Sequence, residues 1–257
     1  MEYFVEKHSV VRQIWGKDDT IMFIFAGAAA EFALNKAVDW LYFTGRLPAD
    51  PLGRLFSTVS YARNIVFAGE ADALKTIDAI AAVHTGVEEK RGMKIPQWAY
   101  RDVLYMLIDY SIRSFETLER TLSTSEKEEV FHTFHKVGTR MGLEGLPATF
   151  EEWKHKRTEN LKTNLQYSAY TADLFGSYKN HLGVLRYIML LKAQTLVVPE
   201  KVLELLKLKK QRFLKPLLGM YKLGKTLYLD RLFKAAILPV KYQKEIRAWN
   251  QSADAHL

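Results

Sequence analysis

Apolar residues recur at three- and four-residue spacing along most of the chain, which is the pattern of helices that bury one face. The pattern is clearest in residues 21–43, 52–67, 71–87, 98–118 and 126–141. No sustained alternation of apolar and polar positions competes with it. We therefore predict an all-α fold of about eight to eleven helices, arranged as a single compact multi-helix domain without a sheet.

Signals for helix starts flank these stretches. Short polar side chains that can cap free backbone N–H groups stand before apolar runs, followed by proline or acids in the first turn. They occur at Asp18 with Asp19, Asp50 with Pro51, Ser123 with Glu126, and Thr149 with Glu152, the last with capping-box spacing. Neither a fixed-period repeat nor a low-complexity linker divides the chain, so we predict one domain over residues 1–257.

The composition narrows the chemistry. The 257 residues are 48% hydrophobic and 26% charged, and they include no cysteine. This excludes disulfides, iron–sulfur clusters, thiolate-ligated haem and cysteine nucleophiles, and leaves histidine and carboxylates as metal ligands. The longest apolar run, residues 21–30, reaches about half of the ~20 residues needed to cross a bilayer. With no recognisable signal peptide, these features predict a cytoplasmic protein.

The net charge of +8 is concentrated toward the C-terminus. Residues 201–247 contain 13 Lys or Arg against three acids, a net +10, which leaves −2 for the rest of the chain. Because the basic residues alternate with apolar ones, we interpret residues 199–248 as basic amphipathic helices that pack on the domain with their charged side in water. Peripheral contact with an anionic membrane surface is the alternative. Nucleic acid is disfavoured because no nucleic-acid motif supports it.

Polar candidates lie at three places on helices that are otherwise rich in apolar residues. His84 shares a face with Ile77, Ile80 and Val87. From the residues alone, a core histidine bonded to a backbone carbonyl is favoured over a ligand. Arg54, Thr58 and Tyr61 form one stripe, and a partly buried Arg needs an anion. Asp109 sits in an apolar context, for which a salt bridge to Arg54 or Arg113 is the simplest explanation.

Motifs for other chemistry are weak. The chain lacks the dinucleotide-binding Gly-x-Gly-x-x-Gly and the metalloprotease His-Glu-x-x-His. His132 and His135 have a spacing that can present two imidazoles to one metal, but their segment is strongly charged, so we interpret it as an exposed helix face. Glu129 and His132 form a Glu-x-x-His pair, and the second pair that a di-iron bundle needs is missing.

Two further motifs point to a family. Residues 50–69 contain Asp-Pro-x-x-Arg-x-x-x-Thr, and residues 71–87 end in Val-His-x-x-Val. With the helix pattern at 26–38 and the turn Leu-Pro-Ala-Thr-Phe-Glu-Glu-Trp at 146–153, they resemble the catalytic domain shared by MpaB-type oxygenases and rubber oxygenases (latex clearing protein). The resemblance extends over residues ~9 to ~248, and these two motifs are its most specific part.

The resemblance implies an all-helical fold with a buried pocket for one b-type haem, whose iron His84 ligates. Arg54, Ser57 and Thr58 match positions where rubber oxygenases keep Arg, Lys and Thr near the open face of the haem, so Ser57 replaces the lysine. Asn35, followed by Lys36, stands where family members often have His-Pro.

The chemistry of these side chains suggests roles. Arg54 can bind a haem propionate or a reduced oxygen species, and Thr58 or Tyr61 can donate a hydrogen bond to bound dioxygen. Asn35 can donate but cannot act as a base, which leaves Glu31, one turn earlier, or water for proton abstraction.

The sequence thus predicts a haem-dependent oxygenase that acts on an apolar small molecule with dioxygen. Two alternatives stay open: a haem-binding or sensing protein without oxygen chemistry, and a peripheral membrane protein that uses the basic C-terminal helices.

Overall fold

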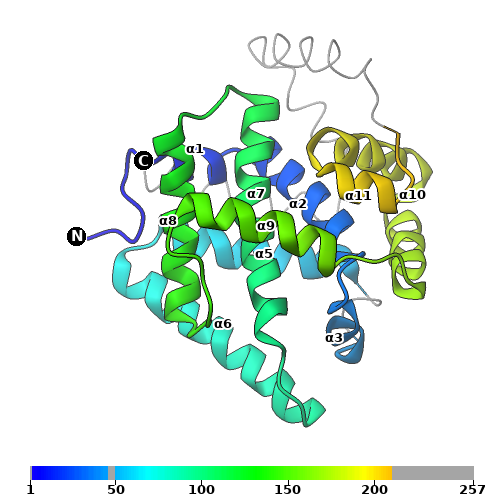
Figure 1. The fold of residues 1–257 in the computed structure, drawn as a ribbon, viewed down its shortest axis with the longest axis horizontal. Helices are drawn as coiled ribbons and strands as arrows, with labels where there is room; N and C mark the ends of the chain where they lie inside the picture. The colour runs from blue at the N-terminus through cyan, green and yellow to red at the C-terminus, as the bar shows by residue number, and fades with distance from the viewer. Residues whose placement is uncertain (1, 46–49, 210–257) are drawn as a thin grey trace.

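The computed structural model describes residues 2–45 and 50–209. Within these ranges the protein is all-α, as expected, with ten helices and no strand (Figure 1). They are α1 (Val10–Trp15), α2 (Asp18–Phe32), α3 (Val38–Phe43), α5 (Pro51–Phe67), α6 (Glu70–Arg91), α7 (Gln97–Leu118), α8 (Thr124–Arg140), α9 (Phe150–Thr163), α10 (Ala169–Val197) and α11 (Glu200–Leu205). Most of the basic segment 199–248 lies outside the described residues.

The central helices are α2 and α7, which pack more extensively on each other than any other described pair. The small residues of α2 allow this close approach. A Cβ on Gly27 would lie 2.3 Å from the ring of Tyr110, so only glycine fits at this crossing. Helix α10 covers another side of α2, while α8 and α9 pack against α7, with α9 crossing in front in Figure 1.

The first apolar stretch, 21–43, is two helices rather than one. The chain turns between Phe32 and Val38, where the side-chain oxygen of Asn35 accepts a hydrogen bond from the N–H of Ala37 at 2.8 Å. The amide nitrogen of Asn35 donates to Asp102 of α7, also at 2.8 Å. The hydrogen bond between Asn35 and Asp102 joins two distant segments and stabilises the turn that separates α2 from α3. The local spacing of apolar residues gives no sign of this turn.

Three of the four predicted caps are present, and the exception is α2, whose N-cap is Lys17 without a side-chain hydrogen bond. The side chain of Asp50 accepts from the N–H of Gly53, and Ser123 forms a reciprocal capping box with Glu126. Thr149 accepts from the N–H of Glu152. Asp18 and Asp19 lie in the first turn of α2, where their negative charge favours the helix N-terminus.

A buried ionic cluster joins α2, α7 and α9. Arg157 donates to both oxygens of Glu31 at 2.5 and 2.6 Å and to Asp109 at 3.0 Å. Arg113 donates to the other oxygen of Asp109 at 2.6 Å, and Tyr110 donates to Glu31 at 2.7 Å. The predicted partner Arg113 is therefore confirmed for Asp109, and Arg157 is an additional one. Burial alone would lower the pKa of Arg157, but the two carboxylates hold it well above its usual value.

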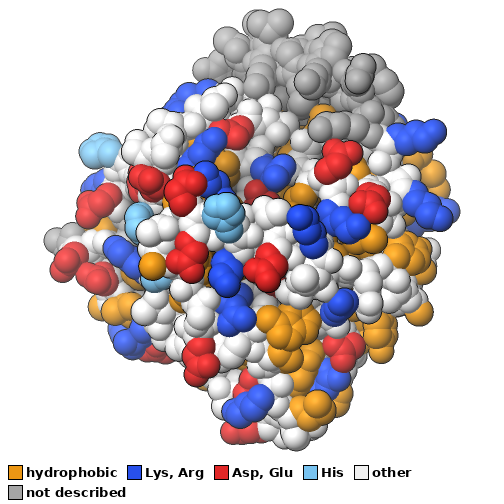
Figure 2. Space-filling view, in the orientation of Figure 1, with side chains coloured by type: hydrophobic (Ala, Val, Ile, Leu, Met, Phe, Trp, Pro, Cys, Tyr) orange, Lys and Arg blue, Asp and Glu red, His pale blue; other side chains and the backbone are white. Residues whose placement is uncertain are grey.

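Charged and apolar side chains are distributed unevenly over the face of the protein shown in Figure 2. Figure 2 shows Lys, Arg, Asp and Glu side chains mixed over the face formed by α8 and α9. Apolar side chains gather along the right edge of that view, over α10 and α3. None of the described helices is both long and apolar enough to cross a membrane.

Candidate functional site

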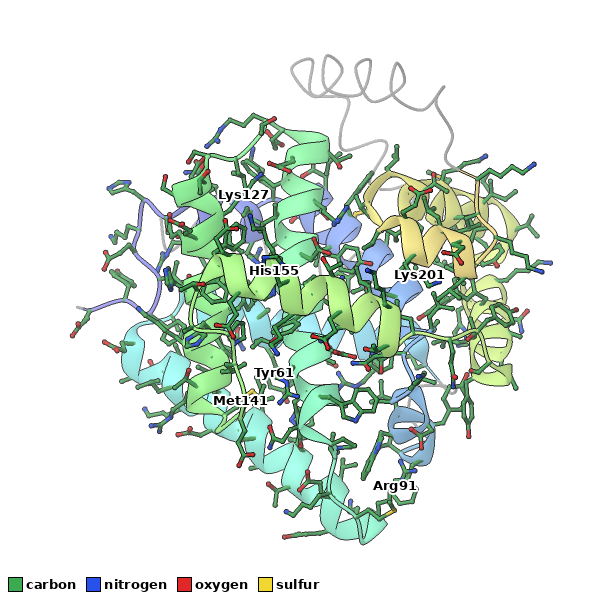
Figure 3. The ribbon with its side chains drawn as sticks, viewed as in Figure 1. Tyr61, Arg91, Lys127, Met141, His155 and Lys201 are labelled. Atoms are coloured by element: carbon green, nitrogen blue, oxygen red, sulfur yellow. The ribbon has the colours of Figure 1, made fainter. Side chains whose placement is uncertain are left out.

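A cavity of about 480 Å³ lies between α6, the turn that follows it and the start of α7. One face of α6 supplies Ala81, His84, Thr85 and Glu88, which follow the three- and four-residue spacing of a helix. Residues 94–97 and Tyr100 form the opposite wall, and Met141 and Leu143 close the cavity from the end of α8. Met141, labelled in Figure 3, lies where the lower end of α8 approaches α6.

His84 is half-buried at the wall of this cavity. Its ring meets the ring of Tyr100 edge to face, with 5.2 Å between centroids and planes 89° apart. Its Nδ1 atom is buried and has no hydrogen-bond partner among the described residues. A backbone carbonyl, that of Ile80, does act on the ring, as the core-histidine interpretation expects, although the contact falls short of standard hydrogen-bond geometry.

The surroundings of His84 favour its neutral form. Burial lowers the pKa of the imidazole, and the positive charge of nearby Arg54 lowers it further. The Ile80 carbonyl and the Glu88 carboxylate act in the opposite direction with smaller effect. A neutral imidazole is the form that binds a metal.

Arg54, Ser57 and Thr58 come together on one turn of α5, which packs against α6. Nη1 of Arg54 donates to Oγ1 of Thr58 at 2.9 Å and to Oγ of Ser57 at 3.2 Å. The Ser57 hydroxyl donates back to the Arg54 carbonyl at 2.8 Å. These contacts hold the guanidinium along its own helix, on the side of α5 from which it influences His84.

The other predicted residues lie elsewhere. Tyr61 is 39% exposed and does not line the cavity (it is labelled in Figure 3). Asn35 is 2% exposed, and both ends of its amide are occupied by Asp102 and the N–H of Ala37. Glu31 is enclosed by Arg157 and Tyr110. The catalytic role predicted for Asn35 stays a prediction, and its observed contacts serve the turn between α2 and α3.

Glu88 is a cavity residue that sequence reasoning missed. Its buried carboxylate accepts from Nζ of Lys94 at 2.8 Å, the N–H of Ile95 at 2.9 Å and the hydroxyl of Tyr100 at 3.1 Å. Burial would raise the pKa of Glu88, but the hydrogen bonds from these groups hold it below its usual value. The signal that could have found it is its place four residues after His84, one turn along the same face.

The remaining histidine candidates form no metal site. His132 is exposed on α8, as predicted, and His135 is partly so. Among the described residues no group of three or more His, Asp or Glu side chains is placed to hold a metal ion.

One motif was also missed in the sequence: Gly219, Gly224, Lys225 and Thr226 have the spacing of a phosphate-binding loop. Such a loop normally joins a strand to a helix, and these residues lie outside the described part of the chain.

Comparison with known protein families shows which family the chain belongs to. The family model for the catalytic domain of the ER-bound oxygenase mpaB/B' and rubber oxygenase matches residues 13–221. The chain belongs to this family. No curated protein and no solved structure matches the chain. The family match spans every residue that lines the cavity, together with Arg54, Ser57 and Thr58. The resemblance drawn from the two sequence motifs is thereby confirmed.

Proposed function

We propose that the protein is a haem b-dependent oxygenase that uses dioxygen on an apolar small-molecule substrate, with His84 as the iron ligand. The observation that carries this proposal is the place of His84: its half-buried imidazole lines the cavity and is held toward the neutral form that binds a metal. Membership of an oxygenase catalytic-domain family supports the type of reaction.

The residues present fit a haem. The cavity volume falls within the roughly 300 to 1,000 Å³ of typical ligand and cofactor sites. Ile95, Pro96, Met141 and Leu143 provide apolar walls, as a flat macrocycle and an apolar substrate require. Arg54 does not line the cavity, but its positive charge acts on His84 from the neighbouring helix α5, so it offers a cation for an acidic side chain of the cofactor.

Each residue has a separate task in this proposal. A bound haem would supply an iron at which dioxygen is activated. His84 would bind that iron through a neutral ring nitrogen. Thr58 and Ser57 hold the Arg54 guanidinium through the hydrogen bonds described above, so their contribution is to orient it. The apolar walls would contact the macrocycle and an apolar substrate. A direct part for Tyr61 in binding the cofactor stays a prediction.

The test is a titration of the purified protein with haem, followed by absorption spectroscopy of the oxidised form and of the reduced form with carbon monoxide. We expect one equivalent of haem with a strong Soret band in the wild type, and its loss in His84→Ala. The matched control is His132→Ala, which removes an exposed histidine and should bind haem like the wild type. A full Soret band in His84→Ala would contradict the proposal.

Oxygen chemistry needs its own measurement. Oxygen uptake by the haem-loaded protein should depend on the addition of an apolar organic substrate from a panel of alkenes and phenols. A non-catalytic haem protein is the second candidate, because the Ser57 hydroxyl that replaces the family lysine is bonded to its own helix. Full haem loading without oxygen uptake on the panel would favour this second candidate.

A further inference from the structure

Glu88 is a buried carboxylate whose two oxygens are both used. It is 8% exposed. Oε1 accepts from the N–H of Ile95 and the hydroxyl of Tyr100, and Oε2 accepts from Nζ of Lys94. A carboxylate taken out of water is costly unless such donors surround it. Its three donors all come from residues that also line the cavity.

Two of these donors belong to the turn between α6 and α7. Helix α6 ends at Arg91 and is capped by Gly92, whose φ of 69° is a left-handed conformation that glycine adopts without strain. The chain then folds back so that the N–H of Met93 donates to the Glu88 carbonyl at 3.2 Å. The Glu88 side chain reaches two residues further, to the N–H of Ile95. Glu88 thus holds the turn through both its backbone and its carboxylate.

The third donor connects Glu88 to the histidine. Tyr100 extends from the first turn of α7 and places its ring edge-on against the ring of His84. Because its hydroxyl is bonded to Glu88, the tyrosine ring is fixed at both ends of its length. A fixed ring at 5.2 Å restricts the orientations that the imidazole can adopt.

We propose that Glu88 is the positioning residue of this site: it fixes residues 94–97 as a wall of the cavity and, through Tyr100, sets the ring plane of His84. The inference rests on the proposed function, in which that ring binds iron. Outer groups that orient a metal-bound histidine commonly change metal affinity or activity by about 10- to 100-fold when removed.

The chain offers matched variants. Glu88→Ala removes every contact of the carboxylate, whereas Glu88→Gln keeps an oxygen for Ile95 and Tyr100 and loses the charge. Tyr100→Phe keeps the ring on His84 and breaks only its bond to Glu88. Glu89→Ala is the control, because it removes an exposed carboxylate at the next position.

Two measurements, hydrogen exchange and the nuclear Overhauser effect, are made on the apoprotein. Two others, the rate of haem loss and the iron–histidine stretching band, are made on the haem-loaded protein. Without haem, we expect Glu88→Ala to speed hydrogen exchange at the Ile95 amide about tenfold or more and to weaken the nuclear Overhauser contact between His84 and Tyr100. With haem, it should speed haem loss about tenfold and shift the iron–histidine stretching band. Glu88→Gln should behave almost like the wild type in each of these four measurements. Tyr100→Phe should shift the band while leaving exchange at Ile95 unchanged.

Several results would overturn the inference. Equal behaviour of the Glu88→Ala and Glu89→Ala variants in exchange and haem loss is one. An iron–histidine band that neither Glu88→Ala nor Tyr100→Phe moves is another. If Glu88→Ala does not fold, Tyr100→Phe decides the question: an iron–histidine band that this variant leaves unmoved overturns the inference. If the wild type binds no haem, the proposed function fails, and the two apoprotein measurements alone support or reject the role of Glu88.

Discussion

Two polar regions of the protein, built partly on the same helix α7, satisfy their buried groups to different degrees. In the Glu31, Asp109 and Arg157 cluster every charge faces an opposite charge within hydrogen-bond distance. In the cavity at the far end of α6, one nitrogen of His84 has no partner among the described residues. Complete pairing is typical of polar groups that serve the fold, whereas a neutral imidazole on the wall of a cavity is available to a ligand.

The largest expected effect on stability comes from removing Arg157, the cation that Glu31 and Asp109 share. Arg157→Met leaves Glu31 and Asp109 buried without their common partner, so we expect the free energy of unfolding to fall by about 3 to 5 kcal/mol. Urea denaturation followed by circular dichroism measures it. Arg140→Met, which breaks an exposed pair with Asp78, is the control and should leave the free energy of unfolding close to that of the wild type. Equal losses in the two variants would show that the cluster contributes no more than a surface pair.

The next effect concerns Asp102, which is 3% exposed and accepts hydrogen bonds from Asn35, Asn160 and Asn164. Burial raises its pKa from 3.8 to about 6, although the bonds from Asn35 and Asn164 act against this. The folded protein therefore takes up this proton at a higher pH than the unfolded chain does.

The sign of the resulting pH dependence follows directly. The stabilisation from protonated Asp102 is complete below about pH 4 and is lost as the pH rises through about 6. We expect the difference in unfolding free energy between the wild type and Asp102→Asn to change by about 3 kcal/mol across that window. Denaturation series at several pH values measure it, and a constant difference would contradict the assignment.

A smaller effect is expected where α2 crosses α7. Gly27→Ala forces a methyl group against the ring of Tyr110, which must move away from Glu31. Overpacking of this kind costs about 1 to 3 kcal/mol. Gly86→Ala is a suitable control, because a Cβ there meets no atom within 4 Å. Thermal unfolding should rank Gly27→Ala well below the control, and the reverse order would argue against close packing at this crossing.

The smallest expected effect on stability is at the cavity. His84→Ala removes a half-buried neutral ring that leaves a nitrogen unpaired, so the apoprotein should unfold within about 1 kcal/mol of the wild type. A loss as large as that of Arg157→Met would mean that His84 serves the fold, and the contrast between the two regions would disappear.

Features encoded locally could be predicted from the sequence. The helix class, the helix caps at Ser123 and Thr149 and the exposed position of His132 depend on short-range patterns. The pairing of Asp109 with Arg113 also lies within one helix, at four-residue spacing. Each of these is set by neighbours in the chain, so the printed residues suffice.

Features that depend on distant segments could not be predicted in the same way. The break after Phe32 depends on Asp102, which is 67 residues away from Asn35. Arg157 reaches Glu31 across 126 positions. Glu88 belongs to the charged run Glu-Glu-Lys-Arg at residues 88–91, and such a run at the end of a helix is typically exposed to solvent. Its buried state comes from the turn that folds back over it.

The most direct test of the central claim is a replacement of the ligand side chain from solution. In His84→Gly the imidazole is missing, and we predict that the variant lacks the wild-type Soret band and regains it when free imidazole is added. His132→Gly should keep the band with or without imidazole. A His84→Gly protein that binds haem with the wild-type spectrum, in the absence of imidazole, would contradict the assignment of His84 as the iron ligand.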